Sequence, residues 1–320
     1  MTTPVSTALP PDAPASAAPL NGVAALPHLG LIRAAGEQAA QFLQGQLTQD
    51  VVLMKPGAAR LAGYCNPQGR LLASFIVCKP SPQEFWLVCS RDLLARTLKK
   101  LSLFVLRAKL TLTDASDELA LYGLIGDTAN SIACSADQAS ENGIKDTYFL
   151  APLPPADGAP RALWIGPAGS APPSGPALPP ALWDWAAARS GVATVSAPII
   201  QAFVPQMLNY ESADGISFKK GCYPGQEVVA RSQFRGAVKR RAFVGHVEGA
   251  AQAGQEVFSA ADPAQPTGLI AQAAAAPQGG TAVIVSIQLT AAQAGDLRVG
   301  APDGPRLSGL RLPYPLREDI

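Results

Sequence analysis

A group of strand-like segments around one tight turn most constrains the fold of this chain. The segments 59–65, 70–78 and 84–89 are strand candidates, and the sequence NPQG at 66–69 separates the first two. Asn-Pro-x-Gly is a strong turn signal, and two strands joined by a tight turn pair antiparallel. The sequence therefore predicts an antiparallel sheet in the first third of the chain.

Helical periodicity flanks these strands on both sides. Apolar residues share one face of segment 36–47, and leucines recur at helical spacing over 91–107. Segments 109–113 and 118–125 are further strand candidates. The order helix, strands, helix, strands predicts an α+β fold rather than a parallel doubly wound one.

Composition divides the chain into three parts. Residues 1–26 are rich in Pro, Ala, Ser and Thr and contain one charged residue, Asp12, so we expect a disordered tail there and structure from about His28. The main body is predicted over 27–237. It includes a second Pro-rich stretch at 152–180 that is expected to be an extended loop with at most a strand over 161–165. Short strand-like runs with turn signals from 238 to 320 predict a small all-β domain, a sandwich or barrel.

The composition also excludes several classes of protein. The 320 residues are 48% hydrophobic, carry a net charge of +1 and contain no apolar run of about 18 residues, so neither a membrane span nor a uniformly basic nucleic-acid binder is indicated. Five cysteines without CxxC spacing and only two histidines argue against a metal site. Unpaired thiols and the lack of secretory-signal features predict a cytoplasmic protein.

One segment, GISFKKGCYPGQE at 215–227, has the features of a chemical site. Pro-Gly favours the centre of a type II turn, and 226–234 is predicted to form a short helix. Cys222 precedes that helix and follows Lys219 and Lys220, and both cations and a helix N-terminus stabilise a thiolate. The alternative is that Cys222 is a small buried hydrophobic residue.

Charge counting adds a second signal in the same region. Seven cations lie between Lys219 and Arg241 and only Glu227 opposes them, so the segment is +6 and the rest of the chain is −5. Such a patch favours a polyanion, such as a folate with its glutamate tail or an RNA backbone. The alternative is a solvated face that pairs with acidic residues elsewhere.

The segment 219–231, KKGCYPGQEVVAR, resembles the signature of the YgfZ family: K-G-C, an aromatic, any residue, G-Q-E, and a basic residue four positions after the Glu. Other pieces that are similar to family elements occur in the same order. They lie at 42–50 (FLQGQLTQD), 66–70 (NPQGR), 106–110 (LRAKL), 205–209 (PQMLN) and 312–314 (LPY).

The resemblance implies a fold and a function. The family is related in fold to the T-protein, a tetrahydrofolate-dependent aminomethyltransferase of the glycine cleavage system. It implies antiparallel α+β modules around a folate-sized opening, followed by a C-terminal β-barrel. Family members are folate-binding proteins that support iron–sulfur enzymes, including those that thiolate tRNA. Expected partners are thus tetrahydrofolate, iron–sulfur enzymes or cluster assembly proteins, and tRNA or a tRNA-modifying enzyme. The alternatives are an aminomethyltransferase and a tRNA-binding module.

The resemblance also implies site residues. Cys222 is the expected reactive thiol, with Lys220 beside it, and we expect this thiol to lie exposed at the mouth of a pterin-sized hole. The residues assigned to the folate site are Trp183, Tyr223, Gln226, Glu227, Arg231 and Asp50.

Two positions, Leu29 and Arg189, depart from the family pattern. Of the two tryptophans associated with the folate site, the second is matched by Trp183, which either stacks on a pterin or packs the helix against the sheet. The first tryptophan's place falls on Leu29. Arg189 lies close to the position at which the T-protein relatives carry a Glu, and an Arg there could bind a folate carboxylate.

Overall fold

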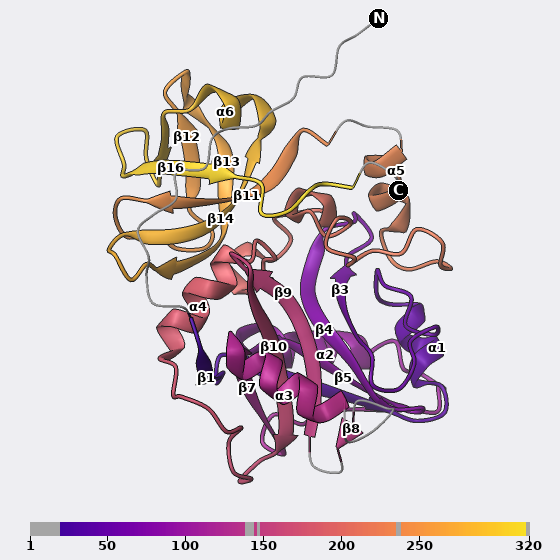
Figure 1. Ribbon diagram of the computed structural model, residues 1–320. Coiled ribbons are helices and arrows are strands. Elements are labelled where there is room, and N and C mark those ends of the chain that lie inside the picture. Colours follow the sequence, from indigo (N-terminus) through magenta and orange to yellow (C-terminus); the bar gives the residue numbers. More distant parts are fainter. Residues whose placement is uncertain (1–19, 138–143, 146–147, 235–237, 318–320) are drawn as a thin grey trace, which may run out of the picture.

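The protein contains two five-stranded antiparallel sheets and a closed six-stranded barrel (Figure 1). A computed structural model describes residues 20–137, 144–145, 148–234 and 238–317. The arrangement confirms the predicted α+β fold with antiparallel sheets and a β-barrel at the C-terminal end of the chain.

The first sheet is built from the strand candidates that surround the NPQG turn. Its strand order is β3-β4-β5-β2-β6. The strands are β2 (Leu29–Ala35), β3 (Ala59–Cys65), β4 (Leu71–Ser81), β5 (Glu84–Ser90) and β6 (Thr111–Asp114). The helices α1 (Ala39–Gln44) and α2 (Arg91–Ser102) pack against this sheet and bury Leu43, Phe85 and Leu101 in a shared core.

The second sheet has the strand order β1-β7-β10-β9-β8. Its strands are β1 (Gly22–Ala25), β7 (Leu119–Ile125), β8 (Ile144–Lys145), β9 (Tyr148–Ala156) and β10 (Ala159–Pro167). The helix α3 (Asp127–Asp137) packs on β1, β7 and β10. A second apolar core joins the two sheets, where Trp86 of β5 meets Phe149 of β9 edge to face at 5.9 Å between ring centroids.

The barrel closes through the strand order β11-β14-β13-β12-β15-β16. Its elements are β11 (Arg240–Val247), β12 (Glu256–Ser259), β13 (Asp262–Ala275), β14 (Thr281–Gln288), α6 (Leu289–Ala294), β15 (Leu297–Val299) and β16 (Arg306–Arg311). The helix α4 (Pro180–Arg189) lies between barrel and second sheet, with contacts to β13, β14, β9 and β1 (Figure 1). Two 3-10 turns, Ala197–Ile199 and Pro205–Leu208, and the helix α5 (Gln226–Phe234) complete the chain between α4 and the barrel.

The ordered body begins earlier than the sequence analysis predicted. The expected tail extended to residue 26, but β1 lies inside it and pairs with β7, and Ala24 and Leu26 are buried. The apolar residues that end the Pro/Ala-rich stretch supply an edge strand, which composition alone does not reveal. Residues 1–19 of the predicted tail lie outside the described residues.

The Pro-rich stretch 152–180 is also more regular than expected. Its first part belongs to a hairpin of β9 and β10, with Gly158 at a φ of +86° in the turn, and only residues 168–179 form a loop. The prolines of β9 follow the two residues that pair with β8, so they fall where that strand has no outer partner in the described part of the sheet. Proline is tolerated there because an edge strand needs no outward N–H donor.

Among the described residues, no helix has the length and apolar character that crossing a membrane requires.

Candidate functional site

The segment with the predicted thiol folds as a turn packed on a second turn. Gly225 has a φ of +81°, the value that the third position of a type II turn requires. Its Cα faces Gly69 of the NPQG turn, and a Cβ on Gly225 would lie 2.6 Å from the Gly69 Cα and collide with the Asn66 carbonyl oxygen. Two pieces that are far apart in the sequence therefore meet through glycine backbones.

Cys222 lies exposed just before this turn. Three of the other cysteines, Cys65, Cys78 and Cys89, are buried, and burial raises the pKa of the Cys65 and Cys89 thiols to about 12. Cys134, on α3, is exposed as well. The alternative that Cys222 is a buried hydrophobic residue is therefore wrong.

Lys220 has a different role from the one predicted. Its side chain is 8% exposed, and its Nζ donates hydrogen bonds of 2.5 Å to the carbonyl oxygens of Gln44 and Leu47, at the end of α1. It also lies 5.0 Å from the centre of the Tyr223 ring. Burial lowers its pKa to about 8, although Asp50 opposes the shift. The ammonium group is thus engaged by α1, and Lys219 is the exposed cation beside Cys222.

Apart from Trp183, the other predicted site residues lie near the contact between Lys220 and the end of α1 or on the helix α5 that follows. Asp50 accepts hydrogen bonds from Gln44 Nε2 at 3.1 Å and from the Leu53 N–H at 3.3 Å. Tyr223 is buried, and its hydroxyl finds no hydrogen-bond partner among the described residues; burial raises its pKa. Gln226 begins α5, whereas Glu227 and Arg231 are exposed on that helix.

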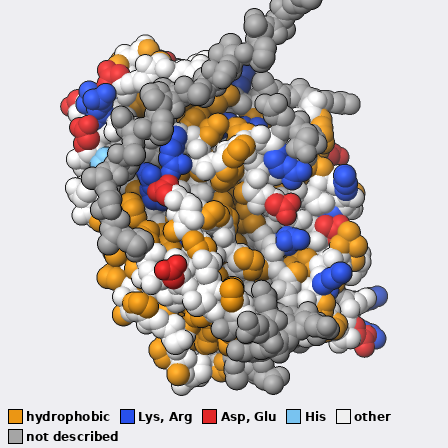
Figure 2. Space-filling view, in the orientation of Figure 1, with side chains coloured by type: hydrophobic (Ala, Val, Ile, Leu, Met, Phe, Trp, Pro, Cys, Tyr) orange, Lys and Arg blue, Asp and Glu red, His pale blue; other side chains and the backbone are white. Residues whose placement is uncertain are grey.

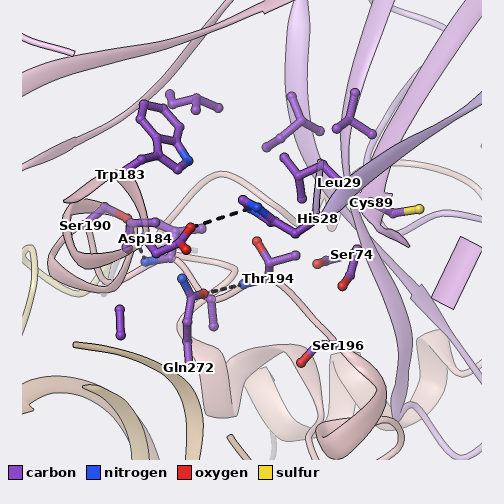
Figure 3. A pocket seen from close by; sticks show the side chains of 18 of the residues that line it. His28, Leu29, Ser74, Cys89, Trp183, Asp184, Ser190, Thr194, Ser196 and Gln272 are labelled. Atoms are coloured by element: carbon purple, nitrogen blue, oxygen red, sulfur yellow. Dashed lines mark hydrogen bonds and ion pairs between the residues drawn. The ribbon is translucent and has the colours of Figure 1, made fainter. Parts of the chain in front are cut away.

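A cavity of about 370 Å³ lies where both sheets, α4 and the barrel meet (Figure 3). Its walls come from β2, β3, β4 and β5 of the first sheet, β9 and β10 of the second, α4, the segment 190–196, Ala253 and β13. This volume is within the range of small-molecule sites in proteins. Apolar side chains line most of it, with Ser74, Thr194 and Gln272 among the polar ones; Gln272 Oε1 accepts the Thr194 N–H at 3.0 Å.

The structure divides the predicted folate site into two places. Trp183 and Leu29, the two tryptophan positions of the family pattern, both line the cavity. No described residue of 219–231 lines it, and neither does Asp50. The motif residues instead pack on α1 and on the turn at 66–69, so the cavity wall does not combine the predicted thiol with Trp183.

Trp183 packs between protein groups and is 3% exposed. A Cβ on Gly123 of β7 would lie 2.5–2.6 Å from three atoms of its six-membered ring, and the Arg161 guanidinium carbon lies over the indole at 4.3 Å from the centroid. The indole thus packs α4 against the sheet, which is one of the two alternatives stated for it, and its contact with a pterin stays a prediction.

Arg161 is the functional candidate that the sequence analysis missed. It lines the cavity, is 7% exposed, and its Nε has no hydrogen-bond partner among the described residues. Its Nη1 donates to the Pro154 carbonyl at 3.4 Å. Burial lowers its pKa to about 10, so the group remains a cation at neutral pH. The signal in the sequence was a lone arginine within an apolar strand.

Asp184 and His28 complete a charged corner beside Arg161. The Asp184 carboxylate lies 3.7 Å from His28 Nε2, and both side chains point into the cavity (Figure 3). Burial raises the pKa of Asp184, while His28 and Arg161 oppose the shift. Arg189, in contrast, pairs with Asp157 at 2.6 Å and does not line this cavity. Among the described residues, no three His, Cys, Asp or Glu side chains gather in a metal-binding group.

Comparisons with known proteins agree with this fold. A GCVT N-terminal domain matches residues 21–150. The aminomethyltransferase T of the glycine cleavage system from Bartonella henselae has the same fold, with a TM-score of 0.56 and 16% identity, covering 84% of this chain and 79% of that one.

Sequence relatives at higher identity give the family. A tRNA-modifying protein YgfZ from Cronobacter sakazakii is 30% identical over 279 residues, which are 78% of this chain and 80% of the relative. The YgfZ of Klebsiella pneumoniae is 31% identical over 255 residues, which are 73% and 74% of the two chains. This chain therefore belongs to the YgfZ family, whose curated members carry the name tRNA-modifying protein.

Proposed function

We propose that the protein binds a reduced folate in the central cavity and, in that form, supports iron–sulfur-dependent tRNA modification. The observation that carries the folate proposal is the buried Arg161, whose Nε is unpartnered among the described residues, in the same cavity as Asp184. A buried cation with spare donors is costly unless a ligand satisfies it.

A tetrahydrofolate matches these two groups chemically. The pterin ring carries adjacent N–H donors, which suit the Asp184 carboxylate, and a carbonyl oxygen, which suits the Arg161 guanidinium. The apolar walls suit the rest of the ring and the aminobenzoyl group. Arg161 rather than the Trp183 face is thus the contact that we assign to the ligand, and the indole holds the guanidinium in place.

Calorimetric titration with tetrahydrofolate under anaerobic conditions tests this assignment. Arg161→Met is expected to weaken binding about tenfold or more, because a charge-assisted hydrogen bond contributes about 1.5–3 kcal/mol. Arg189→Met serves as the matched control, since its guanidinium pairs with Asp157 outside the cavity, and it should bind like wild type. Wild-type protein that binds no folate would overturn the proposal, whereas equal binding by Arg161→Met would remove only this residue's role.

The aminomethyltransferase alternative needs a carboxylate at the folate N5. Two candidate carboxylates are engaged outside the cavity: Asp50 accepts hydrogen bonds near α1, and Asp92 accepts the Ala197 N–H at 2.9 Å. Asp184 is the carboxylate in the cavity, and it faces His28 and Arg161. These contacts favour ligand binding over aminomethyl transfer.

We infer that Cys222 acts on a partner at the protein surface. It is exposed, stands beside the exposed Lys219, and no described residue of its segment lines the cavity. This arrangement supports transient contact with an iron–sulfur protein or its cluster more than attack on a folate-borne carbon. One thiolate cannot hold a conventional four-thiolate cluster, so the contact must be shared with the partner.

Complementation separates this role from a structural one. In a bacterial strain that lacks its own family member, Cys222→Ser is expected to leave thiolated tRNA at the level of the empty vector. Cys134→Ser changes the other exposed thiol and should restore the modification like wild type. Mass spectrometry of the tRNA nucleosides measures both, and full restoration by Cys222→Ser would refute the assigned role.

A further inference from the structure

The end of α2 and the turn after it form an exposed basic and apolar surface, which we call the α2 tip. Its half-buried member is Lys100, and its exposed members are Arg96, Lys99, Leu103, Phe104, Leu106 and Arg107. The three cations on the helix are three and four residues apart, so they share one helical face. From residue 93 to residue 113 the chain contains five cations and no acidic residue.

The apolar members of the α2 tip project into solvent. Leu103, Phe104 and Leu106 are 67%, 48% and 88% exposed. Leu106 has a φ of +42°, a left-handed conformation that leucine rarely adopts. The turn thus holds a large apolar side chain outward although burial would favour it, which is the kind of feature that marks a contact surface.

The charge of the α2 tip is not neutralised by the protein. Within the described residues, none of its four cations forms an ion pair, whereas the neighbouring Lys109 pairs with Glu37 at 3.2 Å. On the face drawn in Figure 2, by comparison, basic and acidic side chains lie interspersed. An unbalanced cluster of cations favours a polyanion.

The basic segment that the sequence analysis singled out is weaker than its charge count suggests. Of its seven cations, Lys220 is buried against α1 and Arg241 pairs with the buried Glu211, while Arg235 lies outside the described residues. The other four, Lys219, Arg231, Lys239 and Arg240, form no ion pair among the described residues, but they are spread from 219 to 240 on either side of Glu227. The α2 tip has its four unpaired cations between 96 and 107 with no acidic residue among them, so its positive charge is the more concentrated along the chain.

We propose that the α2 tip docks tRNA, with the cations on backbone phosphates and Phe104 stacked on an unpaired base. Exposed cations interleaved with an aromatic ring match the two features of RNA that a protein reads on single-stranded loops. The tip has four cations and no acidic residue, and an RNA backbone supplies closely spaced phosphates to such a cluster, so RNA is the occupant that we assign. The proposal deepens the proposed role in tRNA modification but does not depend on the folate cavity.

Binding of fluorescently labelled unfractionated bacterial tRNA tests the proposal. The triple variant Arg96→Gln/Lys99→Gln/Lys100→Gln is expected to bind about tenfold or more weakly, and its plot of log affinity against log salt should be shallower by about two. Phe104→Ala should weaken binding about tenfold through lost stacking, with the wild-type salt slope.

A second triple variant supplies the control. Lys55→Gln/Arg298→Gln/Arg306→Gln removes the same charge elsewhere and should bind tRNA like wild type; Lys55 and Arg306 are exposed, and Arg298 is half-buried and pairs with Asp296. Equal losses of tRNA affinity in the two triple variants would overturn the proposal. Wild-type tRNA affinity in the α2-tip variants would overturn it as well, and would indicate that the tip binds an acidic protein instead. Tetrahydrofolate binding by the α2-tip variants should be unchanged, so failure of the folate proposal and failure of this one give different results.

Discussion

Gly225→Ala is expected to destabilise the protein by about 3 kcal/mol. A left-handed conformation costs a non-glycine residue about 1–2 kcal/mol, and overpacking adds about 1–3 kcal/mol. At this position the added Cβ would collide with the Asn66 carbonyl oxygen and lie 2.6 Å from the Gly69 Cα. Both neighbours are backbone, so relief requires the two turns to separate. Chemical denaturation followed by circular dichroism measures the loss.

Gly221→Ala is the control within the same motif. No atom lies within 4 Å of a Cβ placed there, and the residue does not have a positive φ. The stability of this variant should be within about 0.5 kcal/mol of wild type. Equal destabilisation by the two variants would mean that the contact with the NPQG turn does not determine the effect. If Gly221→Ala is as stable as wild type, a functional defect of this variant concerns Cys222 directly.

Glu211→Ala is expected to cost about 3–5 kcal/mol, because it leaves a largely buried arginine without its counter-charge. Glu211 is fully buried, pairs with Arg241 of β11, and accepts the Ser212 hydroxyl at 3.2 Å. The pair joins the segment before α5 to the barrel. Thermal unfolding should show a lower melting temperature for the variant.

Glu37→Ala makes the same substitution in an exposed ion pair. Glu37 lies 3.2 Å from Lys109, and both side chains are solvated. Exposed pairs contribute at most about 1 kcal/mol, so the melting temperature should change little. If both glutamate variants unfolded at the same temperature as wild type, the ion pair between Glu211 and Arg241 would not contribute to the stability of the fold.

Local signals in the sequence located several elements well. The predicted strand 59–65 and helix 226–234 coincide with β3 and α5. Each is bounded by a glycine-containing turn, so local backbone preference and tertiary structure agree there. Strands β1 and β9 were missed, and only 161–165 of β10 was anticipated, because these Ala- and Pro-rich sequences oppose strand formation and only pairing within the sheet overrides that preference.

The candidate site was predictable in part. The turn at 224–225 and the exposed thiol before it could be predicted, because glycine and proline determine the backbone conformation of the few residues around them. The cavity does not, since its walls come from segments between His28 and Ala275 that only the tertiary fold assembles. Arg161 illustrates the difference: its charge was visible in the sequence, but its stacking on Trp183 and its position at the cavity depend on how α4 packs on the second sheet.

The position of the cavity has a consequence for how the molecule unfolds. Both sheets and the barrel strand β13 line the same cavity, so a bound small molecule would contact all three at once. Ligand that binds only the folded form stabilises it by mass action. Saturation with ligand is then expected to raise the temperature at which the sheets and the barrel unfold, and calorimetric scans of the free and the saturated protein measure the difference.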